Sequence, residues 1–468
     1  MSDDLAFLEL TELQGLLSGG AISSVELTGS VLDRLGRLGP RYNAVATVLR
    51  DRSLREAADS DRQRRRGRSG PLLGIPYGAK DLLAARGGPT TFGSAAFADQ
   101  VLDYDAGVIE RLARAGAVLT AKLALMELAA FHARRPSASL QGPGRNPWNV
   151  DLWAGGSSSG SGSAVAAGIV PFALGSETGG SIGTPASYCG ITGLRPTYGL
   201  VSRFGAMPLS WTLDKIGPMG RSVRDCAIVL EAIAGRDQRD ASSQGRRFSQ
   251  VRAESIDGGR LDQLRVGFST GDIEEAAQPV IRPALRAGFA ALVEGGATLH
   301  ETALPDLPYM AVISAITSAE GATVFAPLIE SESLSLVADP DAREAMRASL
   351  GISARTYLNA TRLRRRIQAA FRKVFAEVDL LATYTLPWPA TPIDEAFTPV
   401  PITGGLTAMV AASNLAGLPA LFVPCGFTGT GLPVGLQLVG PPFSEDLLVA
   451  VGERFQTTSS WHRARPTV

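Results

Sequence analysis

Apolar residues recur along this chain at two different spacings, which separate its predicted helices from its predicted strands. From Leu5 to about Leu38 they repeat at helical spacing, so we predict two packed helices, with Ser23 or Ser24 capping the second. Residues 363–378 carry one apolar stripe, while arginines and a lysine occupy the remaining faces. That pattern predicts an amphipathic helix packed on the core, in preference to an RNA-binding helix.

Short apolar runs bounded by turn residues predict strands. They lie at residues 74–80, 117–123, 169–177, 264–270, 379–386, 420–427 and 433–440. A Gly-rich turn joins the last two runs and suits a hairpin, and a final helix is predicted from Glu445. Because helical and strand patterns alternate, the sequence predicts an α/β layered fold.

Composition and charge exclude several classes of partner. The chain has 468 residues, with 45 Lys and Arg against 45 Asp and Glu, so its formal net charge is zero and favours neither nucleic acid nor an anionic membrane. The start lacks a secretory signal, and the longest apolar stretch, Ala164 to Leu174, is too short to span a bilayer. Three scattered cysteines, Cys189, Cys226 and Cys425, argue against a disulfide framework or a metal site and predict small buried side chains. We expect a cytoplasmic protein that binds no metal, nucleic acid or membrane.

Two glycine- and serine-rich clusters carry the strongest chemical signal. They read AGGSSSGSGSAVAAG at residues 154–168 and GSETGGSIGTPASYCG at residues 175–190. Serine becomes a good nucleophile only when a base removes its proton, and bare glycine backbone can present N–H groups to an oxyanion. If Ser157 and Ser181 meet at one point, the chain is predicted to be a hydrolase.

The base that such a serine needs is not an obvious histidine. The three histidines, His132, His300 and His462, lie beside no serine and in no catalytic signature. Lys80, which ends the apolar run GIPYGAK, is the alternative, because desolvation can keep a buried lysine neutral. Taken alone, Lys80 could equally be a surface lysine paired with the neighbouring Asp81.

The whole pattern resembles the amidase signature family. The resemblance rests on LLGIPYGAKDLL, GPTTFGS, AGAVLTAKLALMELA, RNPWN, both serine clusters, NLAGLPA and LPVGLQLVG. It implies one α/β/α domain spanning residues 1–468 around a large, mixed, twisted sheet, with N-terminal helices, about residues 1–65, packed on the outside. It also implies a cytoplasmic enzyme without a cofactor, acting on a small-molecule amide, and homodimers are common in the family.

The resemblance also implies a mechanism. Neutral Lys80 deprotonates Ser157, Ser157 relays the proton of Ser181, and Ser181 attacks the carbonyl to form an acyl-enzyme that water hydrolyses. The family holds its bridging serine through a cis peptide bond, here between Gly156 and Ser157. The implied oxyanion hole consists of Thr178, Gly179, Gly180 and Ser181.

The expected substrate is an amide, anilide or carbamate with a neutral, largely apolar acyl group. By resemblance, the acyl pocket is bordered by Ala129, Ala130 and Phe131, after a helix beginning near Leu125, and by Trp211. Gly183 stands where the family often has an arginine that could hold an acidic substrate. Phe131 and Trp211 could instead be ordinary core aromatics, since large aromatics are mostly buried.

Three other functions remain open. The first is the glutaminase (A) subunit of the Glu-tRNA(Gln)/Asp-tRNA(Asn) amidotransferase. It is weakened because Thr407 stands where those subunits place an acidic residue, and because the nearest candidate for their arginine, Arg347, lies in a segment shorter than theirs. The second is an α/β-hydrolase, since Gly179, Ser181 and Gly183 satisfy G-x-S-x-G. The third is a non-catalytic scaffold on the same fold. Phosphate binding by GGSSSGSG is disfavoured, because it lacks the Gly-Lys-Ser/Thr ending of a P-loop.

Overall fold

One mixed β-sheet organises the molecule, in a computed structural model that describes residues 3–249, 256, 261–400 and 402–467. Within these residues, eleven strands pair in the order β1-β3-β2-β6-β8-β7-β12-β13-β11-β9-β10. In that order they are β1 (Val45–Val48), β3 (Val118–Leu123), β2 (Pro76–Lys80), β6 (Ala173–Glu177), β8 (Lys215–Gly220), β7 (Thr192–Arg195), β12 (Ala420–Phe427), β13 (Pro433–Val439), β11 (Leu380–Tyr384), β9 (Arg265–Phe268) and β10 (Thr298–Glu301). A separate ribbon pairs β4 (Arg145–Asn146) with β5 (Asn149–Trp153).

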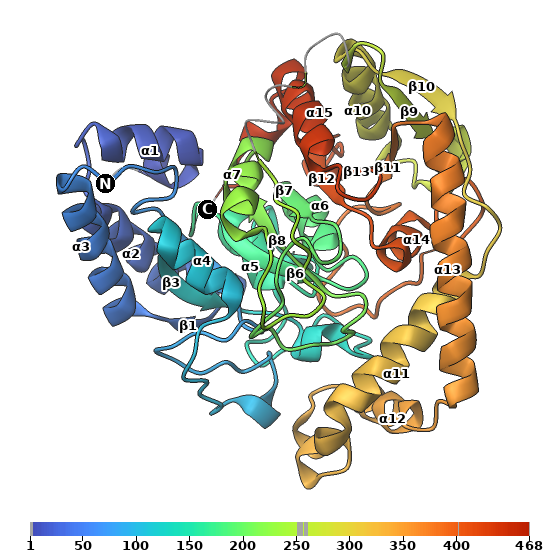
Figure 1. The fold of residues 1–468 in the computed structure, drawn as a ribbon, viewed down its shortest axis with the longest axis horizontal. Helices are drawn as coiled ribbons and strands as arrows, with labels where there is room; N and C mark the ends of the chain where they lie inside the picture. The colour runs from blue at the N-terminus through green and yellow to red at the C-terminus, as the bar shows by residue number, and fades with distance from the viewer. Residues whose placement is uncertain (1–2, 250–255, 257–260, 401, 468) are drawn as a thin grey trace.

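Helices surround this sheet (Figure 1). They are α1 (Leu10–Ser18), α2 (Ser24–Tyr42), α3 (Arg50–Arg65), α4 (Gly107–Ala115), α5 (Ser159–Ala166), α6 (Gly183–Cys189), α7 (Val223–Ile233), α10 (Arg282–Glu294), α11 (Tyr309–Ile329), α12 (Pro340–Ser349), α13 (Ala354–Glu377), α14 (Met409–Ala416) and α15 (Glu445–Thr458). Two large apolar clusters fill the space between sheet and helices. The predicted α/β fold around a large mixed sheet is therefore confirmed.

The pairing of the central strands decides where the two chemical motifs meet. β2 runs parallel to β6, with Ala79 opposite Leu174, so the carboxyl ends of both strands lie at the same edge. Lys80 ends β2, and the second serine cluster begins within the last residues of β6 and continues beyond the end of that strand at Glu177. Every residue of β2 is buried, as expected for a central parallel strand.

Most predicted elements form as their local patterns indicate. Ser23 caps α2 and forms a capping box with Glu26. β12 and β13 form the predicted antiparallel hairpin. In α13, Ile367 and Phe371 are buried, so this helix packs its apolar stripe on the core. In Figure 1, α1, α2 and α3 lie together at the blue, N-terminal end of the molecule.

Two details correct the expectations from sequence. No helix begins near Leu125: the chain there forms only a short 3-10 turn, Glu127–Ala130, in which Leu128 and Ala129 have left-handed backbone angles. The apolar stretch Ala164–Leu174 is also not the one that best matches a membrane span. Among the described residues, α11 alone is long and apolar enough to cross a membrane, judged by length and composition. It packs against α12, α13 and α14.

Candidate active site

Lys80 lies at the centre of a buried cluster of serine hydroxyl groups. Its Nζ is 2.8 Å from Oγ of Ser157, 2.9 Å from Oγ of Ser158 and 2.9 Å from Oγ of Ser176. Lys80 is completely buried. The alternative that it is a surface lysine paired with Asp81 is wrong, because Asp81 pairs instead with the buried Lys122, at 2.6 Å.

The surroundings of Lys80 lower the pKa of its amine. Burial lowers the pKa of Lys80 to about 7, and the negative charges of Asp214 and Glu177 oppose part of this shift. A pKa near the operating pH is the most useful one for a general base. The amine can therefore accept a proton from a neighbouring hydroxyl at neutral pH.

Backbone contacts hold the two serine clusters together. The N–H of Ser158 donates to the carbonyl of Ser181 at 3.3 Å, and the N–H of Met126 donates to the carbonyl of Ser157 at 3.1 Å. The peptide bond between Gly156 and Ser157 is cis, as the resemblance implies. A side chain at Gly156 would lie 2.6 Å from Sδ of Met126, so this position has no room for one. The two clusters thus share one site with Lys80, which lies 77 residues before Ser157 in the sequence.

A buried glutamate shapes the turn that carries Ser181. Oε2 of Glu177 accepts hydrogen bonds from the N–H groups of Ile182 and Gly183, at 2.9 and 3.0 Å. Its Oε1 is 2.6 Å from Arg195 and 3.0 Å from Nδ2 of Asn414. Burial alone would raise the pKa of Glu177, but these partners outweigh it and lower the pKa to about 2. Glu177 is therefore an anion that closes the turn.

That turn leaves backbone donors without partners. Gly180 has a φ of +108°, a conformation that favours glycine. In the part of the chain that the structure describes, the N–H groups of Gly179, Gly180 and Ser181 donate to no acceptor, and the Ser181 hydroxyl has no hydrogen-bond partner. Thr178, the first residue of the implied oxyanion hole, instead donates its hydroxyl to Asp214 at 2.6 Å.

Two cavities border this turn, one lined by Thr178 and the other by Gly179. The first, which we call the Thr178 cavity, has a volume of about 250 Å³ and is lined by Thr178, Ala129 and Trp211, among others. The second, which we call the Gly179 cavity, has a volume of about 270 Å³ and is lined by Gly179 and Thr407, among others. An amide could thus extend in two directions from a carbonyl placed at the turn.

The structure places only two of the four predicted substrate-binding residues at the Thr178 cavity. Ala129 and Trp211 line the Thr178 cavity together. Phe131 is only 4% exposed and packs its ring against Phe325, so it is a core side chain here. Ala130 lies beside a small apolar cluster that contains Trp153. A contact of Phe131 or Ala130 with substrate stays a prediction.

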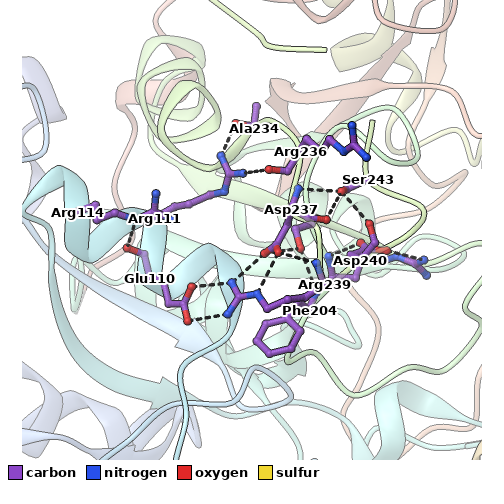
Figure 2. A network of polar contacts seen from close by, with 12 residues as sticks. Glu110, Arg111, Arg114, Phe204, Ala234, Arg236, Asp237, Arg239, Asp240 and Ser243 are labelled. Carbon is purple, nitrogen blue, oxygen red and sulfur yellow. Dashed lines mark hydrogen bonds and ion pairs between the residues drawn. The ribbon is translucent and has the colours of Figure 1, made fainter. Parts of the chain in front are cut away.

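Figure 2 shows a network of polar contacts around Arg239, and three of its residues, Phe204, Arg239 and Asp240, line the Thr178 cavity. Arg239 stacks over the ring of Phe204, 3.8 Å from its centroid, and its guanidinium also pairs with Glu110 at 2.6 Å and Asp237 at 2.9 Å. Arg203 pairs with Asp240 at 3.7 Å and also donates to Oγ of Ser242 at 2.6 Å. These arginines are therefore already paired and do not offer a free cation to a substrate.

Sequence reasoning missed several residues of the site. Glu177, Ser158 and Ser176 stood within or beside the quoted clusters, but their spacing alone gave them no role. Asn414 begins the quoted motif NLAGLPA, and only its contact with Glu177 explains why it belongs here. Asp214 carried no sequence signal, because its contact with Thr178, 36 residues earlier, arises only in the folded chain.

Comparisons with known proteins find similarity over nearly the whole chain. The model of the family described as Amidase matches residues 26–449. Among curated proteins, the A subunit of glutamyl-tRNA(Gln) amidotransferase from Roseiflexus sp. (strain RS-1) is 38% identical over 484 residues, covering 98% of each chain. Among solved structures, the peptide amidase of Stenotrophomonas maltophilia has a TM-score of 0.85 and 32% identity, again covering 98% of each chain. A chain from a vestigial protein complex, described as revealing the origins of an s-triazine catabolic enzyme, has a TM-score of 0.88 and 30% identity, covering 98% of this chain and 100% of its own.

Proposed function

This chain belongs to the amidase signature family, and from that premise we propose that it is a stand-alone serine amidase that cleaves neutral, largely apolar amides. The observation that carries the proposal is the contact of 2.8 Å between Nζ of a fully buried Lys80 and Oγ of Ser157. A lysine whose pKa is about 7 can act as the general base that the distant histidines do not provide.

The proposed reaction begins at Ser181. Neutral Lys80 takes the proton of Ser157, Ser157 takes that of Ser181, and the Ser181 oxygen attacks the substrate carbonyl. The oxyanion is held by N–H groups of the turn at Thr178, Gly179, Gly180 and Ser181, and those of Gly179, Gly180 and Ser181 have no other acceptor among the described residues. Each such donor is worth a few kcal/mol in the transition state. The relay then runs backwards to protonate the leaving amine, and water hydrolyses the acyl-enzyme.

The linings of both cavities support a neutral substrate. Of the described residues that line the Gly179 cavity, none carries a charged side chain. Three cationic residues line the Thr178 cavity, and each already has a partner: Arg203 pairs with Asp240, Arg239 pairs with Glu110, and Lys215 donates to the carbonyl of Leu213. A charged acyl group would lose its hydration without gaining an ionic partner, which is costly. Anilides, primary amides and carbamates with apolar acyl groups are therefore the proposed class.

Gly183 excludes the arginine that the family often has at this position. A Cβ on Gly183 would lie 2.5 Å from the Phe422 ring, so that ring fills the space in which the arginine would start. The absence of this positive charge is thus built into the packing of β12 against α6. It supports the proposal that acidic substrates are poor ones.

The second candidate is the A subunit of an amidotransferase, which is favoured by the names of curated relatives that match nearly the whole chain. Free glutamine would need partners for its ammonium and carboxylate groups. Thr407 lines the Gly179 cavity and bonds its own backbone at Gly404, while Arg347 is exposed on α12 and lines neither cavity. A site without both ionic partners should reject glutamine by a large factor.

The deciding experiment uses the purified chain alone, without nucleotide or metal. We expect it to hydrolyse a chromogenic anilide, and at lower rates primary amides and carbamates, with little release of ammonia from glutamine. Stoichiometric labelling of Ser181 by a fluorophosphonate, absent in Ser181→Ala, would identify the nucleophile and exclude a non-catalytic scaffold. Specific glutaminase activity, or activity only when a partner subunit is added, would favour the amidotransferase. The mass of the active species in solution tests the proposed homodimer.

A further inference from the structure

The loop from Pro208 to Asp214 forms one wall of the Thr178 cavity and carries Trp211. The Trp211 side chain is 39% exposed, and its indole makes no hydrogen bond or ring contact with any residue that the structure describes. By contrast, the backbone of the same loop makes hydrogen bonds at nearly every residue. This contrast indicates a loop built to present one free aromatic side chain.

Asp214 fixes the first half of the loop from the inside. Its Oδ2 accepts hydrogen bonds from the N–H groups of Leu209 and Ser210, at 2.8 and 2.9 Å. Its Oδ1 accepts the hydroxyl of Thr178 at 2.6 Å. The loop is therefore tied directly to the turn that carries the proposed nucleophile.

Glu320 fixes the second half of the loop from the outside. This residue of α11 is only 1% exposed, and its carboxylate accepts four hydrogen bonds. Three come from the loop: Oγ of Ser210 at 2.6 Å, Oγ1 of Thr212 at 2.8 Å and N of Thr212 at 3.1 Å. The fourth comes from the hydroxyl of Tyr357 on α13, at 2.8 Å.

The carbonyl groups of the loop are held as well. Arg364 of α13 donates to the carbonyl of Thr212 at 2.8 Å, and Tyr198 donates to the carbonyl of Trp211 at 2.7 Å. The carbonyl groups of Trp211 and of Thr212 are thus each bound by a different side chain. Since α11 packs against α13, Glu320 connects the cavity wall to a rigid pair of helices.

We propose that Glu320 is a positioning residue that holds the indole of Trp211 against the apolar part of the substrate. An aromatic wall that is already in place costs little conformational entropy when substrate binds, so it lowers KM more than it changes kcat. The inference rests on the proposed function, because it assumes that the Thr178 cavity receives the substrate. It adds a residue outside the cavity that determines specificity.

The test compares four variants on two anilides, one with an acetyl group and one with a large apolar acyl group. Glu320→Ala should raise KM for the large substrate about five- to tenfold while kcat changes less than about twofold. Glu320→Gln should restore most of the affinity. Its Oε1 can accept a hydrogen bond from the N–H of Thr212, and its Nε2 can donate to the hydroxyl oxygens of Thr212 and Tyr357. KM for the acetyl anilide should change little in either variant. Trp211→Ala should raise KM for the large substrate as Glu320→Ala does, and the double variant should show no further increase.

A matched control lies one turn further along α11. Thr323 bonds only the backbone of its own helix, at Ala319, so Thr323→Ala perturbs the helix without touching the loop and should leave KM unchanged. Additive effects of Glu320→Ala and Trp211→Ala, or an equal rise of KM for both anilides, would overturn the inference.

A measurement without turnover separates this inference from the proposed function. The fluorescence of Trp211 is obtained as the difference between each protein and its Trp211→Phe form. Acrylamide should quench this fluorescence more strongly in Glu320→Ala than in wild type and Glu320→Gln. Unchanged quenching would refute the role of Glu320 even in an active amidase. A wild-type protein that hydrolyses none of the amides would refute the proposed function, whatever the quenching result.

Discussion

The dependence of hydrolysis on pH tests the central step, proton removal by Lys80. With a pKa of about 7, the neutral fraction of the amine is about 90% at pH 8 and about 10% at pH 6. Only the neutral form accepts a proton, so kcat/KM should fall about tenfold between these values and level off above pH 8. A lysine with an ordinary pKa of about 10.4 would instead give a rate that keeps rising about tenfold per pH unit up to pH 10.

The assay is the initial rate of anilide hydrolysis between pH 5.5 and pH 10, at substrate concentrations well below KM. Asp214→Asn supplies a directional check, because the negative charge of Asp214 raises the pKa of Lys80. Removing that charge should move the inflection to lower pH, while Lys80→Ala should abolish turnover. A rate that climbs without a plateau to pH 10, or an inflection that Asp214→Asn moves upward, would refute the assignment of Lys80 as the base. So would a fully active Lys80→Ala.

Three further predictions concern stability and specificity around the site. Arg195→Met should cost about 3–5 kcal/mol in denaturant unfolding, because it leaves the carboxylate of Glu177 buried without its cation. The surface control Arg265→Met, which breaks the exposed pair with Asp379, should change the stability much less. Equal losses would contradict this account of the buried pair. Gly183→Arg should lower the melting temperature through its collision with Phe422, by an overpacking cost of about 1–3 kcal/mol. Adding Phe422→Ala should recover part of that loss and raise hydrolysis of amides with an acidic acyl group; a double variant that stays selective for neutral amides would show that Gly183 does not set this preference.

The local elements of this protein were largely predictable because each depends on nearby residues. The capping of α2 by Ser23 requires only a hydroxyl and a glutamate three residues later. The β12–β13 hairpin follows from two apolar runs around a Gly-rich turn. The helix that the resemblance implied near Leu125 was a wrong prediction. The residues of this segment favour a helix, but the fold holds Leu128 and Ala129 in left-handed conformations. There, tertiary contacts override local preference.

The sequence by itself determined the candidate chemistry: Lys80 and the two serine clusters were recognisable as a resemblance before any contact was known. Only the tertiary structure decided that Lys80 is buried, that Nζ reaches Ser157 from 77 residues away, and that Phe131 belongs to the core. The same is true of Glu177 and Glu320, whose partners lie on several elements. The physical reason is that hydrophobic periodicity and capping act over a few residues, whereas burial, hydrogen-bond partners and pKa depend on groups that the sheet and helices bring together from distant parts of the chain.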